Sequence, residues 1–486
     1  MTAYGGMQVM LTNNNIGRRD FIRLLGAVGA VSLVSGCTSL RELAGRGKKR
    51  NVLFIVVDDL RPQLGCYGHK QMLSPNIDRL ASEGVLFSRA YCQVPVCGAS
   101  RASVMTSIRP TRNRFINYKT WADKDAPNAI TLPEHFKNNG YHTISNGKVF
   151  HHRTDAAESW SEEPWRPKGT WLNYLTAESK ALLAKVGPRG PAFEAADVGD
   201  SDYFDGMIAD KSISDLNRLK SMDKPFFLAA GFLKPHLPFN APKRYWDLYK
   251  REEINLADNP FRPKGAPDAA LHNWGELRQY ANIPKEGPLD DELARTLIHG
   301  YYACVSYTDA QIGRILAELD NLGLRDDTVV VLWGDHGWQL GEHGLWCKHC
   351  NFETSLHSPL IVRAPGIKGP KNTNRLVEYL DIYPSLCQLC NLPVPSQANG
   401  TSFVPLMKNP NRPGKKAVFS RFIKGDSVKT DRYRYTEWTR ENGDLYARML
   451  YDHKTDPAEN INISELPEDK ELVEELSRML KELKSQ

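Results

Sequence analysis

The chain has 486 residues, of which 41% are hydrophobic and 25% are charged. This ordinary globular composition excludes a collagen-like, a disordered or a multi-span membrane protein. The chain has 63 basic and 57 acidic residues. Residues 1–50 contain eight of the basic and two of the acidic ones, so the whole net charge of +6 lies in that segment. The rest of the chain is neutral and has no global field that would favour a nucleic acid.

The chain begins with a basic segment and an apolar run. Arg18 and Arg19 precede the run at 24–34, which is too short to span a bilayer as a stable helix. A basic flank, a short apolar run and small residues predict an export signal. The paired arginines are similar to the twin-arginine type. We therefore expect a periplasmic or cell-surface protein.

The end of this segment resembles a lipobox, in which Cys37 is lipidated and becomes the mature N-terminus. The alternative is a plain export signal in which Cys37 is incidental. We expect a twin-arginine lipoprotein signal at 1–37 and a basic, flexible tether at 38–50. Contact with a membrane is then limited to export and to the lipid anchor at Cys37.

Beyond the tether, buried-strand patterns alternate with helical patterns. The continuous apolar run at 51–57 is typical of a strand buried on both faces of a parallel sheet. Ser74, as N-cap, and Pro75 open a predicted helix that Gly84 closes. Further strands are predicted at 141–145, 225–231, 328–333 and 359–362. This alternation predicts an α/β domain at 51–400 with a large mixed, mainly parallel sheet sandwiched by helices.

The remaining segments differ in character. The stretches 155–200 and 250–295 are rich in proline, glycine and charge, and we expect surface insertions that shape access to a site. Residues 401–486 are expected to form a small α+β subdomain. Its predicted elements are strands at 417–422, 427–430, 433–439 and 448–452 and an amphipathic helix at 468–484.

Two C-x-x-C pairs raise the alternative of a structural zinc site. Cys387 and Cys390 fall in a predicted helix, where they would be apolar residues, and Cys347 and Cys350 fall in a loop. Zinc is therefore the less favoured interpretation, and a disulfide pattern cannot be deduced from the nine cysteines.

Acidic residues follow two of the predicted strands. Asp58 and Asp59 come after the strand at 51–57, and Asp335 and His336 come after the strand at 328–333. In α/β sheets, ligands bind at the carboxyl ends of the strands. Three carboxylates and an imidazole at one edge can hold a hard divalent cation.

Cys97 lies in the segment Cys97-Gly98-Ala99-Ser100-Arg101, ahead of a helical pattern at 102–107. A nucleophile at a helix N-terminus lies in a positive local field that favours anions. The alternative is a buried thiol near the start of a helix.

This segment resembles the signature of the sulfatase family, in which the cysteine is converted to Cα-formylglycine. Further segments match in order, beginning with the first strand and Asp58-Asp59, which is similar to the family's opening metal-binding strand. Two of them indicate the iduronate-2-sulfatase branch: 147–151, Gly-Lys-Val-Phe-His, and 234–236, Lys-Pro-His. The others are the helix at 76–81, the segments 334–337 and 340–344, and 433–457. Ala99 stands where many members have proline, and 105–110 departs from the usual Leu-Thr-Gly-Arg. The resemblance covers residues 50–480 and implies an alkaline-phosphatase-like fold.

The resemblance also implies roles for individual residues. A maturase would convert Cys97 to formylglycine, whose hydrated diol attacks sulfur and later expels sulfate. One divalent cation, expected to be Ca²⁺, would be bound by Asp58, Asp59, Cys97, Asp335 and His336. Arg101 would hold the diol, His151 would act as base and His236 as general acid. Lys148 and Lys348 would bind sulfate oxygens, and Lys234 and His343 would contact substrate.

The predicted function is sulfuric ester hydrolysis on a sulfated saccharide during polysaccharide degradation. Exo-action on a terminal sugar is expected, with a 2-O-sulfated uronate first. One alternative is a phosphonate or phosphate ester hydrolase, because related folds use the same metal-binding edge. Another is a lipoprotein that binds glycans without turnover because Cys97 is never oxidised.

Overall fold

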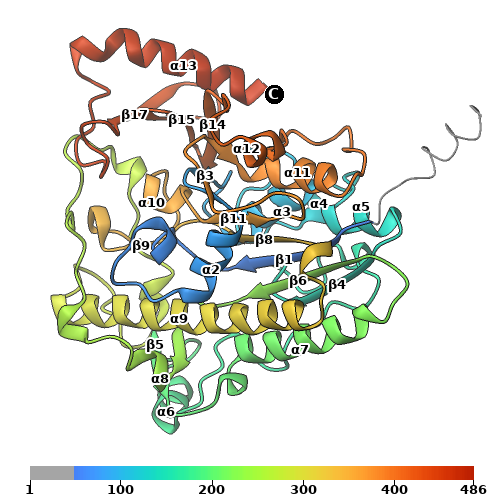
Figure 1. Ribbon diagram of the computed structural model, residues 1–486. Coiled ribbons are helices and arrows are strands. Elements are labelled where there is room, and N and C mark those ends of the chain that lie inside the picture. Colours follow the sequence, from blue (N-terminus) through green and yellow to red (C-terminus); the bar gives the residue numbers. More distant parts are fainter. Residues whose placement is uncertain (1–48, 486) are drawn as a thin grey trace, which may run out of the picture. The chain divides into compact units, whose positions relative to one another are not determined.

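A seven-stranded sheet lies at the centre of the protein, in the order β12-β2-β11-β8-β1-β6-β4 (Figure 1). The computed structural model describes residues 49–485, so the predicted signal, Cys37 and all but the last residues of the tether lie outside the described residues. The strands are β1 (Asn51–Val57), β2 (Val85–Phe87), β4 (His142–Gly147), β6 (Phe226–Phe232), β8 (Thr328–Gly334), β11 (Leu360–Arg363) and β12 (Lys371–Thr373).

The sheet is mixed but mainly parallel, as predicted. Strands β4, β6, β1 and β8 run parallel to one another, whereas β11 is antiparallel to both β8 and β2. Strand β12 is parallel to β2. In the register of the central pair, Val57 lies opposite Gly334, so the carboxyl ends of β1 and β8 meet at one edge.

Two hydrophobic cores cover the two faces of the sheet, because successive side chains of a strand point in opposite directions. Leu53, Ile55 and Val57 of β1 belong to one core, and the alternate residues of β1 belong to the other. The first core packs against α2 (Pro75–Glu83), α7 (Phe204–Lys220) and α9 (Asp291–Asn321) (Figure 1). The second packs against α3 (Cys97–Thr106), α5 (Leu132–Asn138) and α11 (Ile382–Leu389).

Several boundaries differ from the sequence-based expectation. Helix α3 begins at Cys97 and not at residue 102, so the thiol lies in the first helical turn. Ser74 occupies the N-cap position of α2, but its hydroxyl accepts from the backbone N–H of Gly65 and donates to Asp78. The hydroxyl therefore links a loop to the helix and does not cap it.

The two C-x-x-C pairs do not form one zinc site. Cys347 and Cys350 belong to the core on one face of the sheet, and Cys387 and Cys390 belong to the core on the other. All eight described cysteines are free thiols.

A second, antiparallel sheet makes up most of the C-terminal part. Its strands are β14 (Ala417–Phe422), β15 (Gly425–Thr430), β16 (Tyr433–Thr439) and β17 (Leu445–Asp452), in chain order. Helix α13 (Lys470–Ser485) lies on this sheet, with Val473, Leu476 and Leu480 buried against it (Figure 1).

The remaining elements are short and connect the larger ones. They are β3 (Ala90–Tyr91), β5 (Phe193–Ala196), β7 (Phe239–Pro242), β9 (Gln339–Leu340), β10 (Trp346–Cys347), β13 (Val377–Glu378), α4 (Ala122–Asp125), α6 (Ala177–Val186), α8 (Lys243–Trp246), α10 (Glu353–Leu356) and α12 (Val404–Lys408). Among the described residues, no helix has the length and apolar character needed to cross a membrane.

Candidate active site

The carboxyl ends of β1 and β8 bring the predicted acidic residues together. Asp58, Asp59, Asp335 and His336 are each 0% exposed. The backbone N–H of Asp59 donates to Asp335 Oδ1 at 3.0 Å, which joins the two strand ends directly. Because these carboxylates lie in a shared buried space, they need cations nearby.

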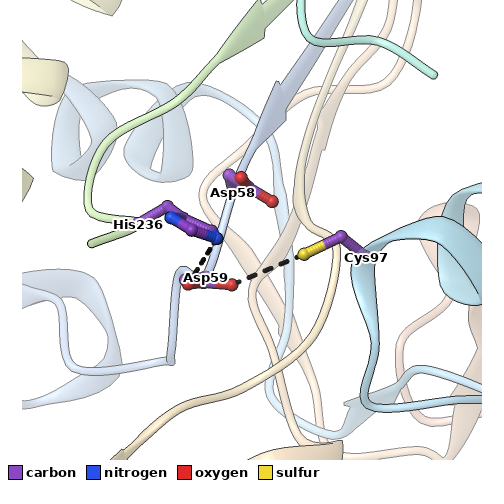
Figure 2. Close-up of side chains that lie close together, drawn as sticks. All are labelled: Asp58, Asp59, Cys97 and His236. Atoms are coloured by element: carbon purple, nitrogen blue, oxygen red, sulfur yellow. Dashed lines mark hydrogen bonds and ion pairs between the residues drawn. The ribbon is translucent and has the colours of Figure 1, made fainter. Parts of the chain in front are cut away.

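Cys97 faces this cluster from the first turn of α3, as Figure 2 shows. Its Sγ lies 3.3 Å from His336 Nε2 and 3.8 Å from Asp59 Oδ1. The turn is pressed against a neighbouring loop, since a Cβ added to Gly98 would lie 2.8 Å from the Tyr118 carbonyl oxygen. Glycine after the cysteine therefore allows the helix start to reach the cluster.

Arg101, one helical turn later, links both strand ends. Its Nε donates to Asp335 Oδ2 at 2.9 Å, and its Nη2 donates to Asp58 Oδ1 at 3.0 Å. Its Nη1 donates to the carbonyls of Lys148 and Val149. Burial opposes the charge, but Asp335 and Asp58 raise the pKa of Arg101, so it stays a fixed cation.

Two lysines reach the aspartates from separate loops. Lys148 Nζ donates to Asp58 Oδ2, and Lys348 Nζ donates to Asp59 Oδ1 at 2.8 Å. Burial disfavours the charge on Lys348, but the carboxylates around it, Asp59 above all, hold its pKa well above the usual value. Burial also raises the pKa of Asp59, to about 7, although the positive charge of Lys348 acts to lower it.

The lysine after β4 is positioned by a close backbone approach. Lys148 N donates to the carbonyl oxygen of Gly231 on β6 at 2.8 Å. A Cβ on Gly231 would lie 2.2 Å from the Lys148 carbonyl carbon and oxygen. Only glycine fits at position 231. Because Gly231 has no side chain, the backbone of Lys148 can lie directly against it, and this contact fixes where Lys148 leaves the sheet.

Two histidines complete the predicted set. His236 Nε2 lies 3.9 Å from Asp59 Oδ2 (Figure 2), and its Nδ1 lies 2.6 Å from the Leu237 carbonyl oxygen. His151 also lines the cavity beside the site. Burial lowers the pKa of His151 to about 2, and its Nδ1 has no hydrogen-bond partner among the described residues. Burial therefore keeps this imidazole neutral, and a pKa this low also makes it a weak base in the structure as it stands.

The two predicted substrate contacts lie elsewhere or are already engaged. Lys234 borders the cavity, but its Nζ donates to the carbonyls of His236 at 3.0 Å and Pro238 at 2.6 Å. His343 is not at the cavity; it stacks on Phe352 at 4.2 Å, and its Nε2 lies 2.8 Å from the Ala458 carbonyl oxygen. His343 therefore does not line this cavity, because its ring packs against the C-terminal part, and its expected contact with substrate stays a prediction.

A cavity of about 1180 Å³ opens onto Cys97, Lys148 and Lys348. Both insertions line it, as do residues of the C-terminal sheet and its turns. The insertions therefore shape access to the site, as expected. The lining residues from these three parts include Arg166, Trp171, Arg189, His272, Glu276, Lys424, Trp438 and Tyr446.

One residue at this site was missed by the sequence-based reasoning. Glu276, in the second insertion, lies 3.0 Å from His236 Nε2 and 3.2 Å from Lys348 Nζ. Burial alone would raise the pKa of Glu276, but Lys348 and His236 hold it well below the usual value. No motif surrounds this residue; the one signal was that the insertion was expected to shape access.

Two groups of side chains here could hold a metal ion. Asp58, Asp59, Cys97 and His236 offer ligand atoms within 4.8 Å of one another, and so do Cys97, Asp335 and His336. His336 Nδ1 lies 2.9 Å from the Gly337 carbonyl oxygen, to which it donates. Its Nε2 therefore keeps a lone pair that faces the Asp59 and Asp335 carboxylates at 3.4 and 3.6 Å.

This fold and this edge of acidic, cationic and thiol groups define an ester hydrolase of alkaline-phosphatase-like architecture. The family model "Sulfatase" matches residues 50–392, and the model "N-sulphoglucosamine sulphohydrolase, C-terminal" matches residues 341–486. The chain therefore belongs to the sulfatase family and is a sulfuric ester hydrolase.

Known proteins resemble the chain over most of its length. Human iduronate 2-sulfatase is 34% identical over 85% of this chain and 90% of its own length. A sulfatase of Formosa agariphila is 32% identical over 89% of this chain and 86% of its own. A solved structure in complex with its substrate D-glucosamine-2-N,6-O-disulfate has a TM-score of 0.71 at 23% identity, covering 90% of this chain and 98% of that one.

Proposed function

We propose that the protein removes sulfate from the terminal sugar of a sulfated saccharide, with a formylglycine formed from Cys97 as the nucleophile. The observation that supports this best is the position of Cys97. It lies in the first turn of α3, 3.3 Å from His336 Nε2, beside three buried carboxylates and at the floor of the cavity. A thiol buried only for packing would not need this set of charges.

The other residues then take complementary roles. Asp58, Asp59, Asp335 and His336 would hold a divalent cation, which we expect to be Ca²⁺ because most of these donors are oxygens. When bound, such a cation supplies charge stabilisation to oxygens of the ester. With the aspartates holding a cation, Lys148 and Lys348 would no longer be needed to neutralise them and could bind sulfate oxygens instead.

Proton transfer is assigned to the two histidines. His236, oriented by the Leu237 carbonyl, protonates the leaving sugar oxygen. His151 is assigned the proton of the diol when sulfate is expelled, because its Nδ1 has no hydrogen-bond partner among the described residues. Arg101 does not titrate, and it keeps the two strand ends in register around the nucleophile.

The maturation of Cys97 has a direct test. Peptide mass spectrometry should find an aldehyde in place of the Cys97 thiol when the protein is produced with a formylglycine-generating maturase. Cys97→Ala should fold normally and lose turnover. Substantial activity of Cys97→Ala would contradict the proposal, and an unmodified but glycan-binding protein would support a lipoprotein that binds without turnover.

The substrate is proposed to be an anionic sugar sulfate, with a 2-O-sulfated uronate first. Arg153, Arg189 and Lys424 line the cavity, and none forms an ion pair with another described residue. These cations suit a second acidic group near the ester. The human relative's name, iduronate 2-sulfatase, supports the same substrate class.

Product analysis on a defined sulfated oligosaccharide tests both the sugar and exo-action. Loss of sulfate from internal units while the terminal unit stays sulfated would refute exo-action, and no turnover of any uronate sulfate would refute the first choice of sugar. Phosphonate monoesters belong in the same assay. A phosphonate monoester hydrolase of Agrobacterium radiobacter shares the fold, with a TM-score of 0.74 at 23% identity, covering 90% of this chain and 96% of that one.

We further propose export and a lipid anchor at Cys37. The sequence pattern of 1–37 supports this proposal. Metabolic labelling with a radioactive fatty acid should mark the wild-type protein and leave Cys37→Ala unlabelled. Equal labelling of the two would refute the anchor, and retention of both in the cytoplasm would refute export.

A further inference from the structure

We propose that Glu276 is a positioning residue: its carboxylate holds His236 and Lys348 in the orientation that the sulfatase reaction needs. This inference rests on the proposed function of His236 and Lys348, and it adds a residue outside every motif discussed above. Glu276 comes from the insertion at 250–295, whereas His236 follows β6 and Lys348 follows β10.

The carboxylate of Glu276 contacts both partners at once. Its Oε1 lies 3.0 Å from His236 Nε2, and its Oε2 lies 3.2 Å from Lys348 Nζ. The side chains are 12%, 13% and 3% exposed for Glu276, His236 and Lys348, so water competes weakly for these contacts. A charge-assisted contact in such a setting is stronger than a surface ion pair.

For His236, Glu276 fixes the second end of the ring. The Leu237 carbonyl accepts at Nδ1 over 2.6 Å, and Glu276 is the acceptor at Nε2. With both ring nitrogens held, the imidazole plane has one orientation, in which Nε2 faces Asp59 and the cavity. Trp171 meets the same ring edge-to-face at 5.5 Å and limits its rotation.

Glu276 is the carboxylate that would still hold Lys348 in place once Asp59 binds a cation. The ammonium now lies between Asp59 Oδ1 at 2.8 Å and Glu276 Oε2 at 3.2 Å. In the proposed reaction, Asp59 binds a cation and the ammonium moves to a sulfate oxygen. Without Glu276, this long side chain would have no second carboxylate to limit its movement.

The segment that carries Glu276 is itself rigid. On one side, the Trp274 indole N–H donates to the Gly344 carbonyl at 2.9 Å. On the other, Leu277 and Tyr280 are 1% and 0% exposed in the main core. The backbone that bears Glu276 is therefore fixed on both sides, which is what a positioning residue requires.

The proposed step defines where Glu276 matters most. The nucleophile oxygen forms a bond to sulfur as the S–O bond to the sugar breaks, and the electron pair of the broken bond goes to the sugar oxygen. That oxygen then replaces the Glu276 carboxylate as the acceptor at His236 Nε2 and takes the proton, while sulfate stays on the nucleophile. A sugar alkoxide is a poor leaving group and needs this proton. A nitrophenolate is stable without it. A misplaced His236 therefore harms the two esters unequally.

The experiment compares turnover of a sugar sulfate and of 4-nitrophenyl sulfate by wild type and Glu276→Gln. Glutamine keeps the size of the side chain and removes its charge. On the sugar sulfate, kcat is expected to fall by roughly 100-fold, the low end for a lost general acid. On the aryl sulfate, the fall should be about tenfold, because only charge stabilisation by Lys348 is weakened. KM should change much less than kcat.

Two variants serve as controls. Glu286→Gln removes a charge from an exposed position in the same insertion and should leave both rates unchanged. Glu276→Asp keeps the carboxylate and should keep the ratio of the two rates close to that of wild type, which preserves the test if Glu276→Gln folds poorly.

Equal losses on both esters, or no loss on either, would overturn the positioning role while leaving the proposed function intact. A matured wild-type protein that hydrolyses neither ester would refute the proposed function itself, and the role of Glu276 with it.

Discussion

Replacing Arg101 by methionine should destabilise the protein more than any surface substitution. The guanidinium is 0% exposed and lies 3.0 Å from Asp58 Oδ1 and 2.9 Å from Asp335 Oδ2. Removing one partner of a buried ion pair costs about 3–5 kcal/mol, because the partner charge stays buried without compensation. Methionine replaces the apolar stem of arginine as far as Nε, so the loss reflects the charge and hydrogen bonds of the guanidinium more than packing of the stem.

This free energy converts into a measurable melting temperature. The folded unit is Arg50–Gln486. For a unit of roughly 440 residues, the entropy of unfolding is about 0.9 kcal/mol/K, so Arg101→Met should melt about 3–5 °C lower. Differential scanning calorimetry in a chelator measures this without help from a bound cation. Added calcium should reduce the difference, because it neutralises the same carboxylates.

Arg79→Met provides the matched control. Arg79 is 39% exposed and pairs with Asp320 at 3.2 Å on the surface. Its loss should cost at most about 1 kcal/mol. If the two variants melted within 1 °C of each other, the argument from buried charge would be refuted.

Three further changes have defined outcomes. Burial alone would raise the pKa of Glu378, but Lys415 and Arg109 lower it from 4.5 to about 2. The stabilisation from ionised Glu378 is therefore present above pH 4.5 and lost as pH falls toward 2. In urea unfolding, the loss of unfolding free energy caused by Glu378→Gln should shrink over that range. A loss that stayed constant with pH would contradict this. Gly231→Ala should displace Lys148, because the Lys148 carbonyl lies 2.2 Å from the added Cβ. This change should lower kcat and reduce the free energy of unfolding by about 1–3 kcal/mol. An unchanged kcat would contradict this prediction. Chelation should abolish turnover and calcium restore it, whereas stoichiometric zinc by elemental analysis would refute the expected ion.

The sheet and its acidic edge were predictable because they depend on local patterns. Strand β1 is buried throughout, and after Asn51 no polar residue interrupts it before Asp58. Parallel pairing then puts the carboxyl ends of β1 and β8 together, so Asp58, Asp59 and Asp335 had to meet. In the central sheet, the ends of the five predicted strands shifted by at most two residues from the expected positions.

The start of α3 was harder to predict, because tertiary contacts decide it. Glycine and serine in the first turn are weak helix formers, and no side chain caps the helix. Burial compensates: every residue from Cys97 to Thr106 is buried, and Ser100 Oγ donates to the Asp335 carbonyl at 2.5 Å. The helix therefore begins where its contacts begin, one turn before the helical pattern of the sequence.

His343 and Glu276 show the limit of motif reasoning. His343 follows a matched motif, yet its ring packs on Phe352 away from the cavity. Glu276 has no motif, yet it meets two predicted site residues that are far from it in sequence. Which insertion residue faces a site depends on how the whole insertion folds over the sheet, and no local pattern carries that information.

The charges of the site, taken together, favour a sulfate ester over a phosphate monoester. Among the described residues, and with Asp59 in its ionised form, four carboxylates face three fixed cations: Asp58, Asp59, Asp335 and Glu276 against Arg101, Lys148 and Lys348. A buried site with one excess negative charge would repel every anionic ester. A bound divalent cation reverses that excess to a single positive charge, which the single negative charge of a sulfate ester neutralises. A phosphate monoester, with two negative charges, would leave the buried site negative again. If these carboxylates hold the cation, as proposed, they would also set which ester the cavity can accept, and Glu276 would contribute its charge to that balance.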